Sequence, residues 1–385
     1  MKKFLCTWGR YFKLTGYAGT GKSFVSSYFI GYLVEIKIRF CVAAPTHKAV
    51  KNLVEMLTQM GLVREQHYQA YTLAQLLGLQ PEIDYERGKE VFTNQKPASL
   101  KDFDLCIIDE FSMISQDTFE QIGAEIRKAP TKVIFVGDPA QLPPVKESLS
   151  PVAQVEMPTA TLTEVVRYAG EIARVADIIR SEPQYRQKRY HFTKATDGTI
   201  EVLNYAQWFN QVIAYFQRDE VWEDPDYCRV ITWTNRQVDR INQEIRQALF
   251  GADVAPYIMG DRVIAKRPIQ RRAQIEGMSQ WAIAGDNRME FTIIEEPTLC
   301  WDLSESFEYY TLPSRGENGK MLELHVLTPK GEQARKAQKE RLAREAKQLA
   351  ADGDKSYQHK WMAYFDLDKR FDTVCHSRVL TAHSA

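Results

Sequence analysis

Short apolar runs alternate with longer stretches of helical periodicity over the first 160 residues of the chain. An apolar run of about 4–8 residues predicts a buried strand, and apolar positions that recur every three or four residues predict a helix. Their alternation is typical of a mostly parallel sheet with helices on both faces, so we expect an α/β fold. The predicted strands are Tyr11–Leu14, Arg39–Ala43, Leu105–Ile108 and Lys132–Val136, and the predicted helices are Phe24–Val34, Thr46–Met60 and Gln116–Lys128.

This pattern is interrupted between Tyr71 and Lys101, where prolines and a glycine surround a few strand-like residues. Proline and glycine mark turns and loops rather than the interior of a sheet. We therefore expect a first domain over residues 1–160 that carries an inserted hairpin or small subdomain at about residues 71–101.

A second α/β segment is predicted over residues 161–256. It begins near Thr161 and contains a predicted helix at Glu171–Ile179, a strand at Arg229–Trp233 and a helix from Arg236 to about Leu249. We expect this segment to form the first part of a second parallel-sheet domain.

The periodicity changes again after residue 256. Short alternating strands predict a small β-barrel over Tyr257–Glu296. The run Glu332–Ala351 has opposite charges at helical spacing, which predicts a solvated helix. Residues 257–375 are therefore expected to form a barrel and helical insertion, and residues 376–385 to begin the return to the second domain.

Charge and cysteine content limit the possible classes of protein. The chain of 385 residues carries 50 Lys and Arg against 50 Asp and Glu, so nucleic acid would have to bind in a local groove. The six cysteines include no Cys-x-x-Cys pair, which favours buried thiols in a reducing compartment. No run reaches about 18 apolar residues and the N-terminal run is too short for a signal peptide, so we expect a cytoplasmic protein without a membrane span.

The segment Gly16–Ser23, GYAGTGKS, matches the phosphate-loop pattern G-x-x-x-x-G-K-[ST] at every position and lies between a predicted strand and a predicted helix. Its glycines let backbone N–H groups curl around phosphates, Lys22 can reach the β- and γ-phosphates, and the Ser23 hydroxyl can bind Mg²⁺. The pattern predicts a nucleoside triphosphate site. Its expected binding residues are Gly16, Ala18, Gly19, Thr20, Gly21, Lys22 and Ser23.

Two further polar segments follow buried strands of the same predicted sheet. In LCIIDEFS, Asp109 can hold Mg²⁺ through water and Glu110 can polarise the attacking water, and an acidic turn is the alternative. In VGDPAQLPPV, Gln141 lies where it can sense the γ-phosphate, and a proline-rich surface turn is the alternative. The two segments favour a nucleotide-hydrolysing site over a phosphate loop that only binds.

In this order along the chain, GYAGTGKS, AAPTHKA at Ala43–Ala49, IIDEFS, VGDPAQLPPV and LTEVVR at Leu162–Arg167 resemble the motifs of superfamily-one DNA helicases. The similarity is greatest to the B branch, the RecD-like and Dda-like group that moves 5′ to 3′, and it covers about residues 10–300. The resemblance implies a P-loop NTPase fold with two RecA-like parallel-sheet domains and small β-rich insertions. It also implies an ATP-dependent DNA helicase or translocase that acts on single-stranded DNA and duplex junctions, with a replication or repair protein as a possible partner.

The resemblance assigns roles to individual residues. Lys22, Ser23, Asp109 and Glu110 would bind ATP with Mg²⁺ and catalyse its hydrolysis, and Gln141 would couple the γ-phosphate to the DNA-binding face. Arg167 matches the arginine finger that enters from the second RecA-like domain. The implied catalytic residues are Lys22, Asp109, Glu110, Gln141 and Arg167, and the implied metal ligands are Ser23 and Asp109.

The same resemblance implies contacts to the DNA backbone. Pro45, Thr46 and His47 resemble the motif that grips this backbone, because a helix N-terminus can donate N–H groups to a phosphate; a simple helix cap is the alternative for Thr46. The other implied contacts are Tyr71, Thr72, Thr234 and Asn235. The aromatic residues that could stack on bases, although core packing is expected for most of them, are Phe92, Trp233 and Trp281. The predicted barrel resembles the SH3-like insertion that braces the duplex-splitting pin of this group.

The chain departs from the family pattern at both ends, so it resembles an internal fragment of a helicase. The 15 residues before Gly16 lack the family's adenine-reading glutamine, and Val379–Ala385 resembles only the beginning of a motif that continues into Gln-Gly. Two alternatives stay open: a helicase remnant that binds ATP or single-stranded DNA without unwinding, and a phosphate-loop kinase. A kinase needs an arginine-rich lid and an acceptor pocket, and AAPTHKA and VGDPAQLPPV argue against it.

Overall fold

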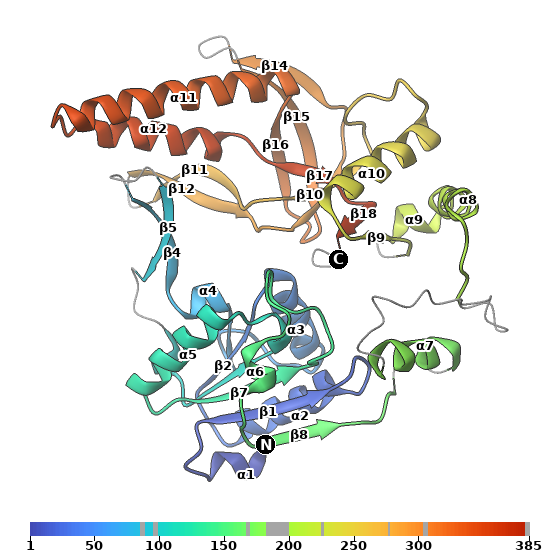
Figure 1. Ribbon diagram of the computed structural model, residues 1–385, viewed down its shortest axis with the longest axis vertical. Helices are drawn as coiled ribbons and strands as arrows, with labels where there is room; N and C mark the ends of the chain where they lie inside the picture. Colours follow the sequence, from blue (N-terminus) through green and yellow to red (C-terminus); the bar gives the residue numbers. More distant parts are fainter. Residues whose placement is uncertain are drawn as a thin grey trace. The chain divides into compact units, whose positions relative to one another are not determined.

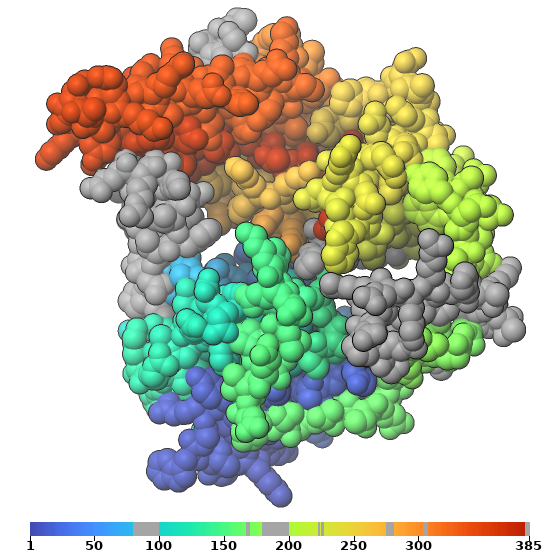
Figure 2. All heavy atoms as spheres, viewed as in Figure 1, coloured from blue at the N-terminus to red at the C-terminus, as the bar shows by residue number. Residues whose placement is uncertain are grey.

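The computed structural model describes residues 1–84, 89–94, 99–166, 170–181, 200–224, 227–275, 278–302 and 307–381. The chain divides into two compact units, whose segments can be followed by residue number in Figure 2. Unit 1 comprises Met1–Glu82 and Val91–Val202, and unit 2 comprises Ile83–Glu90 and Leu203–Ala385.

Unit 1 is built on a six-stranded parallel sheet in the order β3-β2-β6-β7-β1-β8 (Figure 1). The central strands are buried along their whole length, as expected for a parallel sheet that helices cover on both faces. The strands are β1 (Tyr11–Gly16), β2 (Phe40–Ala44), β3 (Gln69–Thr72), β6 (Leu105–Ile108), β7 (Lys132–Gly137) and β8 (Thr159–Leu162).

Helices lie on both faces of this sheet. In β6, Leu105 and Ile107 join the core that α2 and α3 cover, whereas Cys106 and Ile108 join the core that α5 covers. The predicted α/β P-loop fold is therefore confirmed for this unit. The helices of unit 1 are α1 (Lys2–Leu5), α2 (Lys22–Glu35), α3 (His47–Gln59), α4 (Leu73–Leu76), α5 (Gln116–Lys128), α6 (Pro151–Gln154) and α7 (Gly170–Ser181), with 3₁₀ turns at Ser99–Asp102 and Phe111–Met113.

Two expected segment limits differ from the observed ones. Tyr71 and Thr72 belong to the core strand β3, so the inserted hairpin starts later and consists of β4 (Leu79–Asp84) and β5 (Lys89–Asn94). Thr161 does not open a second sheet, because β8 pairs with β1 from Lys13↔Thr159 to Gly16↔Leu162. The pairing of a short edge strand depends on tertiary contacts that local periodicity does not show.

Unit 2 contains an antiparallel sheet in the order β14-β15-β13-β10-β17, with β16 on the other edge of β15. Its core includes Val263, Phe291, Leu312 and Leu324. The sheet extends well beyond the predicted barrel segment. Its strands are β10 (Arg262–Ala265), β13 (Glu290–Ile293), β14 (Thr298–Asp302), β15 (Phe307–Gly316), β16 (Met321–Leu327) and β17 (Val374–His376), and a separate hairpin consists of β11 (Ile269–Ile275) and β12 (Met278–Gly285).

Two long helices, α11 (Pro329–Ala351) and α12 (Tyr357–Arg370), lie side by side within unit 2 (Figure 1). The Thr328 hydroxyl caps α11 by accepting a hydrogen bond from the backbone of Gly331, which confirms a helix here that starts earlier than predicted. Asp368 of α12 forms ion pairs with Arg335 and Lys339 of α11.

A small α/β layer completes the description of unit 2. Strands β9 (Val230–Thr232) and β18 (Val379–Thr381) pair in parallel, and α10 (Asn235–Phe250) packs against them together with α8 (Tyr205–Phe216) and α9 (Glu220–Glu223). Among the described residues, none of the helices is both long and apolar enough to cross a membrane.

A buried ionic cluster connects this layer to the antiparallel sheet. The fully buried carboxylate of Asp261 lies 2.5 Å from Arg246 of α10 and 3.3 Å from Arg378. Arg246 also lies 3.2 Å from Nε2 of His376 in β17. Burial lowers the pKa of His376 to about 4, and the two arginines act in the same direction against Asp261.

Candidate nucleotide site

The phosphate loop joins the end of β1 to the start of α2. Gly16 is required by space, because a Cβ there would lie 2.8 Å from the carbonyl oxygen of Leu162 and 2.6 Å from Oγ1 of Thr20. Gly21 is required by conformation, since its φ of 82° lies in the left-handed region. Gly21 occupies the N-cap position and has no side chain to accept hydrogen bonds from the first turn of α2. These N–H groups and the positive end of the helix dipole form an anion-binding site.

The lysine of the motif lies over its own loop. Lys22 Nζ donates hydrogen bonds to the carbonyl oxygens of Gly16 at 2.7 Å and Tyr17 at 2.9 Å. The Thr20 hydroxyl also donates to the carbonyl of Tyr17, at 2.8 Å. The loop is therefore held in a compact shape that brings a cation to the N-terminus of α2.

The acidic pair follows β6 directly. The Asp109 N–H donates to the carbonyl of Ala43 in β2 at 2.9 Å, and the Glu110 N–H donates to Oδ1 of Asp109, also at 2.9 Å. Glu110 has a φ of 54° and a ψ of 46°, a left-handed conformation that is costly for a residue with a side chain and occurs often at functional sites.

Burial and mutual repulsion disfavour two carboxylates at this position. Burial raises the pKa of Asp109, opposed by its hydrogen bond from Glu110 and by Lys22. Burial and the neighbouring Asp109 raise the pKa of Glu110 to about 7, and Lys22 opposes this shift. A cation near both carboxylates would relieve this cost, and with the Ser23 hydroxyl they offer the oxygen ligands that Mg²⁺ prefers. The residues present therefore fit a nucleotide with Mg²⁺.

A single cleft of unit 1 brings most of the predicted site together. Gly16 and Thr20 shape the turn beneath it rather than its lining. Sequence reasoning missed the α3 residues that form one wall, since they read only as helix positions, and it missed Phe24, whose side chain is 72% exposed. The lining residues are Ala18, Gly19, Gly21, Lys22, Ser23, Phe24, Ala49, Asn52, Leu53, Met56, Asp109, Glu110, Gln141 and Val166.

The predicted arginine finger, Arg167, lies outside the described residues. The residue before it, Val166, is described, and its N–H donates to the carbonyl of Gly19 at 2.8 Å. The chain therefore runs along the phosphate loop up to residue 166.

Asp138 is a site residue that the sequence reasoning quoted in VGDPAQLPPV without singling it out. Its side chain is 3% exposed, and its Oδ2 accepts a hydrogen bond from the N–H of Ala18 at 2.8 Å. Its Oδ1 accepts from the N–H of Ala140 at 2.9 Å, and its carbonyl accepts from the N–H of Gln141 at 3.1 Å. A buried acid after a strand is the signal that could have identified it.

The predicted DNA contacts of unit 1 have local structural roles. Pro45 and Thr46 follow β2, and the Thr46 hydroxyl caps α3 by accepting from the N–H of Ala49 at 3.2 Å; His47 is the first residue of that helix. The Tyr71 ring packs against Phe103. Thr72 is 4% exposed and forms a capping box with Gln75, so its hydroxyl is engaged inside the unit.

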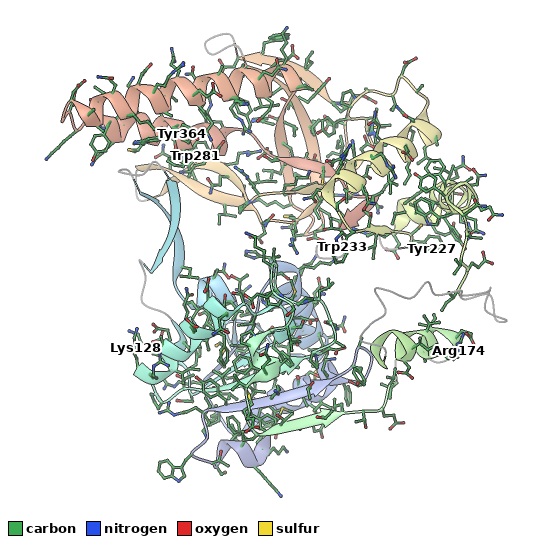
Figure 3. All side chains as sticks on the ribbon, in the orientation of Figure 1. Lys128, Arg174, Tyr227, Trp233, Trp281 and Tyr364 are labelled. Carbon is green, nitrogen blue, oxygen red and sulfur yellow. The ribbon has the colours of Figure 1, made fainter. Side chains whose placement is uncertain are left out.

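The candidates of unit 2 lie at the start of α10. Thr234 follows β9, is exposed, and caps α10 by accepting from the N–H of Gln237 at 3.3 Å; Asn235 is the first helical residue. The preceding Trp233 is 73% exposed (Figure 3), so core packing was the wrong expectation for this residue.

The other two aromatic candidates differ from Trp233. Trp281 is half-buried in β12, where its Nε1 donates to Asp366 at 3.1 Å and its ring lies under Arg272. The side chain of Phe92 lies outside the described residues.

Comparisons with known proteins agree with this geometry. Residues 1–197, just over half of the chain, match the AAA domain family. An uncharacterized protein, R530, of Acanthamoeba polyphaga mimivirus is 30% identical over 278 residues, which cover 65% of this chain and 54% of that protein.

Two further relatives carry functional names. The ATP-dependent DNA helicase dda of Enterobacteria phage T4 is 26% identical over 291 residues, 73% of this chain and 62% of that protein. The RecBCD enzyme subunit RecD of Buchnera aphidicola is 35% identical over 147 residues, 35% of this chain and 23% of that protein. The chain spans less than two thirds of the length of each of these relatives. The similarity that the ordered motifs predicted is confirmed.

Proposed function

The chain belongs to the AAA domain family, in the branch with RecD-like, Dda-like and Pif1-like proteins, and we propose that it is an ATP-dependent DNA helicase or translocase. The observation that carries this proposal is the cleft that collects Lys22, Ser23, Asp109, Glu110 and Gln141 around one helix N-terminus. A site that only binds nucleotide needs the phosphate loop. The acidic pair and the glutamine are the additions that hydrolysis requires.

Each residue of the cleft has a distinct task in this proposal. The first turn of α2 and Lys22 bind the phosphates, and Ser23 and Asp109 hold the metal. When bound, Mg²⁺ neutralises charge that develops on the phosphate oxygens. Glu110 orients the attacking water, and Gln141 senses the γ-phosphate. Arg167 supplies positive charge in the transition state, an assignment that rests on the LTEVVR motif and on the placement of Val166 beside Gly19.

For the DNA we propose single-stranded DNA, held at duplex junctions and tracked from 5′ to 3′. Thr46 and Thr234 each cap a helix that follows the carboxyl end of a parallel strand, so each helix N-terminus is a place where N–H groups can meet a phosphate. The exposed Trp233 beside Thr234 provides a surface on which a base can stack. A replication or repair protein as partner, and a cytoplasmic location, are predictions that these residues do not test.

Hydrolysis of ATP with and without single-stranded DNA tests the proposal. We expect turnover by the full chain that rises when single-stranded DNA is added, followed by strand separation on a duplex with a 5′ overhang. Binding of ATP without turnover would favour the helicase remnant. Phosphate transfer to a small molecule would favour the kinase.

A further inference from the structure

The carboxylate of Asp138 joins two segments of the nucleotide site that are far apart in the sequence. One oxygen accepts from the Ala18 N–H in the phosphate loop, and the other accepts from the Ala140 N–H in the turn that carries Gln141. Because a charged group that is 3% exposed is stable only when hydrogen-bonded, both bonds are needed to hold it there.

The turn itself depends on the same residue. The Gln141 N–H donates to the backbone carbonyl of Asp138, so both the side chain and the backbone of Asp138 define the position of Gln141. The far end of the segment is fixed independently, since the buried Ser150 hydroxyl donates to the carbonyl of Ile114 at 2.8 Å. Asp138 is therefore the connection between this segment and the phosphate loop that hydrogen bonds of the described residues provide.

We propose that Asp138 is a positioning residue that couples the phosphate loop to Gln141, so that a shift of the loop on binding triphosphate moves the Gln141 turn with it. This inference rests on the proposed function, because it needs Gln141 to act on bound nucleotide. Hydrogen bonds to a charged acceptor are short and strong, which suits a link that must transmit small displacements. The negative charge of Asp138 also contributes to the raised pKa of Glu110, which places it close to the acidic pair as well.

The variant Asp138→Asn tests the coupling with little change in side-chain volume. An amide has one acceptor and one donor group, so it can satisfy the N–H of Ala18 or that of Ala140 but not both. We expect kcat for ATP hydrolysis to fall at least about tenfold and stimulation by single-stranded DNA to be lost. The affinity for a non-hydrolysable ATP analogue should change less than about threefold, because Lys22 and the α2 N-terminus remain.

A double-mutant cycle separates coupling from general loosening of the unit. If Asp138 acts through Gln141, adding Asp138→Asn to Gln141→Ala should lower kcat by less than about threefold further. Ser150→Ala is the matched control, since it removes a buried hydrogen bond of the same segment without touching the phosphate loop or Gln141. It should lower the melting temperature while kcat stays within about twofold of the parent. Unchanged kcat in Asp138→Asn, or the full loss in both backgrounds, would overturn the inference.

Hydrogen exchange of the parent chain keeps the inference testable if the variants do not fold. Binding of the ATP analogue should slow amide exchange in the phosphate loop and in the 138–141 turn together. Protection of the loop without the turn would contradict the coupling. No protection of the loop at all would contradict the proposed function itself, and the inference with it.

Discussion

The ammonium nitrogen of Lys22 lies 2.7 Å from the backbone carbonyl oxygen of Gly16, the residue that opens the phosphate loop. A second hydrogen bond to the carbonyl of Tyr17 holds the same nitrogen at 2.9 Å. Both acceptors are neutral, whereas a phosphate oxygen is charged and accepts a stronger hydrogen bond. The lysine is therefore placed to exchange a weaker pair of acceptors for a stronger one when a triphosphate binds.

Replacing this lysine should abolish turnover. In Lys22→Ala the phosphates lose their main cationic partner, and we expect ATP hydrolysis to fall by at least about 10²-fold. Binding of single-stranded DNA should stay measurable, because the candidate DNA contacts lie on other segments. The control is Lys128→Ala at an exposed lysine of α5 (Figure 3), which should hydrolyse ATP like the parent. Parent-level hydrolysis in Lys22→Ala would refute the site assignment.

Arg167 should matter more for turnover than for binding. The charge that it is proposed to meet develops in the transition state, so Arg167→Ala should lower kcat for ATP by about 10²-fold or more while nucleotide affinity changes little. Single-turnover hydrolysis and equilibrium binding of nucleotide measure the two quantities separately. Arg174→Ala is the control, since Arg174 is an exposed residue of α7 that pairs with Glu171. Equal losses of affinity and turnover in Arg167→Ala would contradict the finger role.

Trp233 should contribute to DNA binding without contributing to stability. Its side chain is 73% exposed, so Trp233→Ala removes little buried area and should leave the melting temperature unchanged. Stacking on one base contributes about 1–3 kcal/mol, so affinity for single-stranded DNA should fall by about tenfold. Fluorescence anisotropy of a labelled oligonucleotide measures this change. Trp8→Ala, at a fully exposed tryptophan of unit 1, is the control that should bind like the parent.

The buried His376 should make the stability of unit 2 depend on pH. Its pKa is about 4 in the folded chain and about 6.5 in an unfolded one, so between these values only the unfolded chain takes up the proton. The free energy of unfolding should therefore fall as pH decreases from 6.5 to 4, by up to about 3 kcal/mol, and this contribution should be complete above pH 6.5.

Tryptophan fluorescence is a suitable probe for this transition, because six of the seven tryptophans lie at residue 208 or later. Urea unfolding at several pH values should give a steeper acid dependence for the parent than for His376→Asn. The variant His359→Asn, at an exposed position of α12, should keep the parent's slope. Identical slopes for the parent and His376→Asn would show that the histidine is not held neutral.

Local patterns were sufficient where a residue's role depends on its immediate neighbours. The strand Leu105–Ile108 is predicted and observed with the same bounds, and α5 likewise, because the first is a continuous apolar run and the second begins at a Ser115 cap. Lys22, Ser23 and Asp109 could be assigned to one site because the carboxyl ends of parallel strands meet at one edge of a sheet.

Other features required contacts between residues distant in sequence. Thr72 and Trp233 were both expected from motif position, yet the first is enclosed by a capping box and the second is open to solvent. The edge strand β8 was assigned to the wrong sheet, because four residues of alternating exposure pair equally well with many partners until the fold selects one.

The sequence by itself determined the phosphate loop, the acidic pair and the α/β class, since each depends on the residue types within a short segment. Only the tertiary structure decided that Asp138 joins Ala18 to the Gln141 turn and that Asp261 binds two arginines from separate elements. The reason is physical: a buried charge is stable only beside its hydrogen-bonding partners, and here those partners are about 115–120 residues away for Ala18 and Arg378.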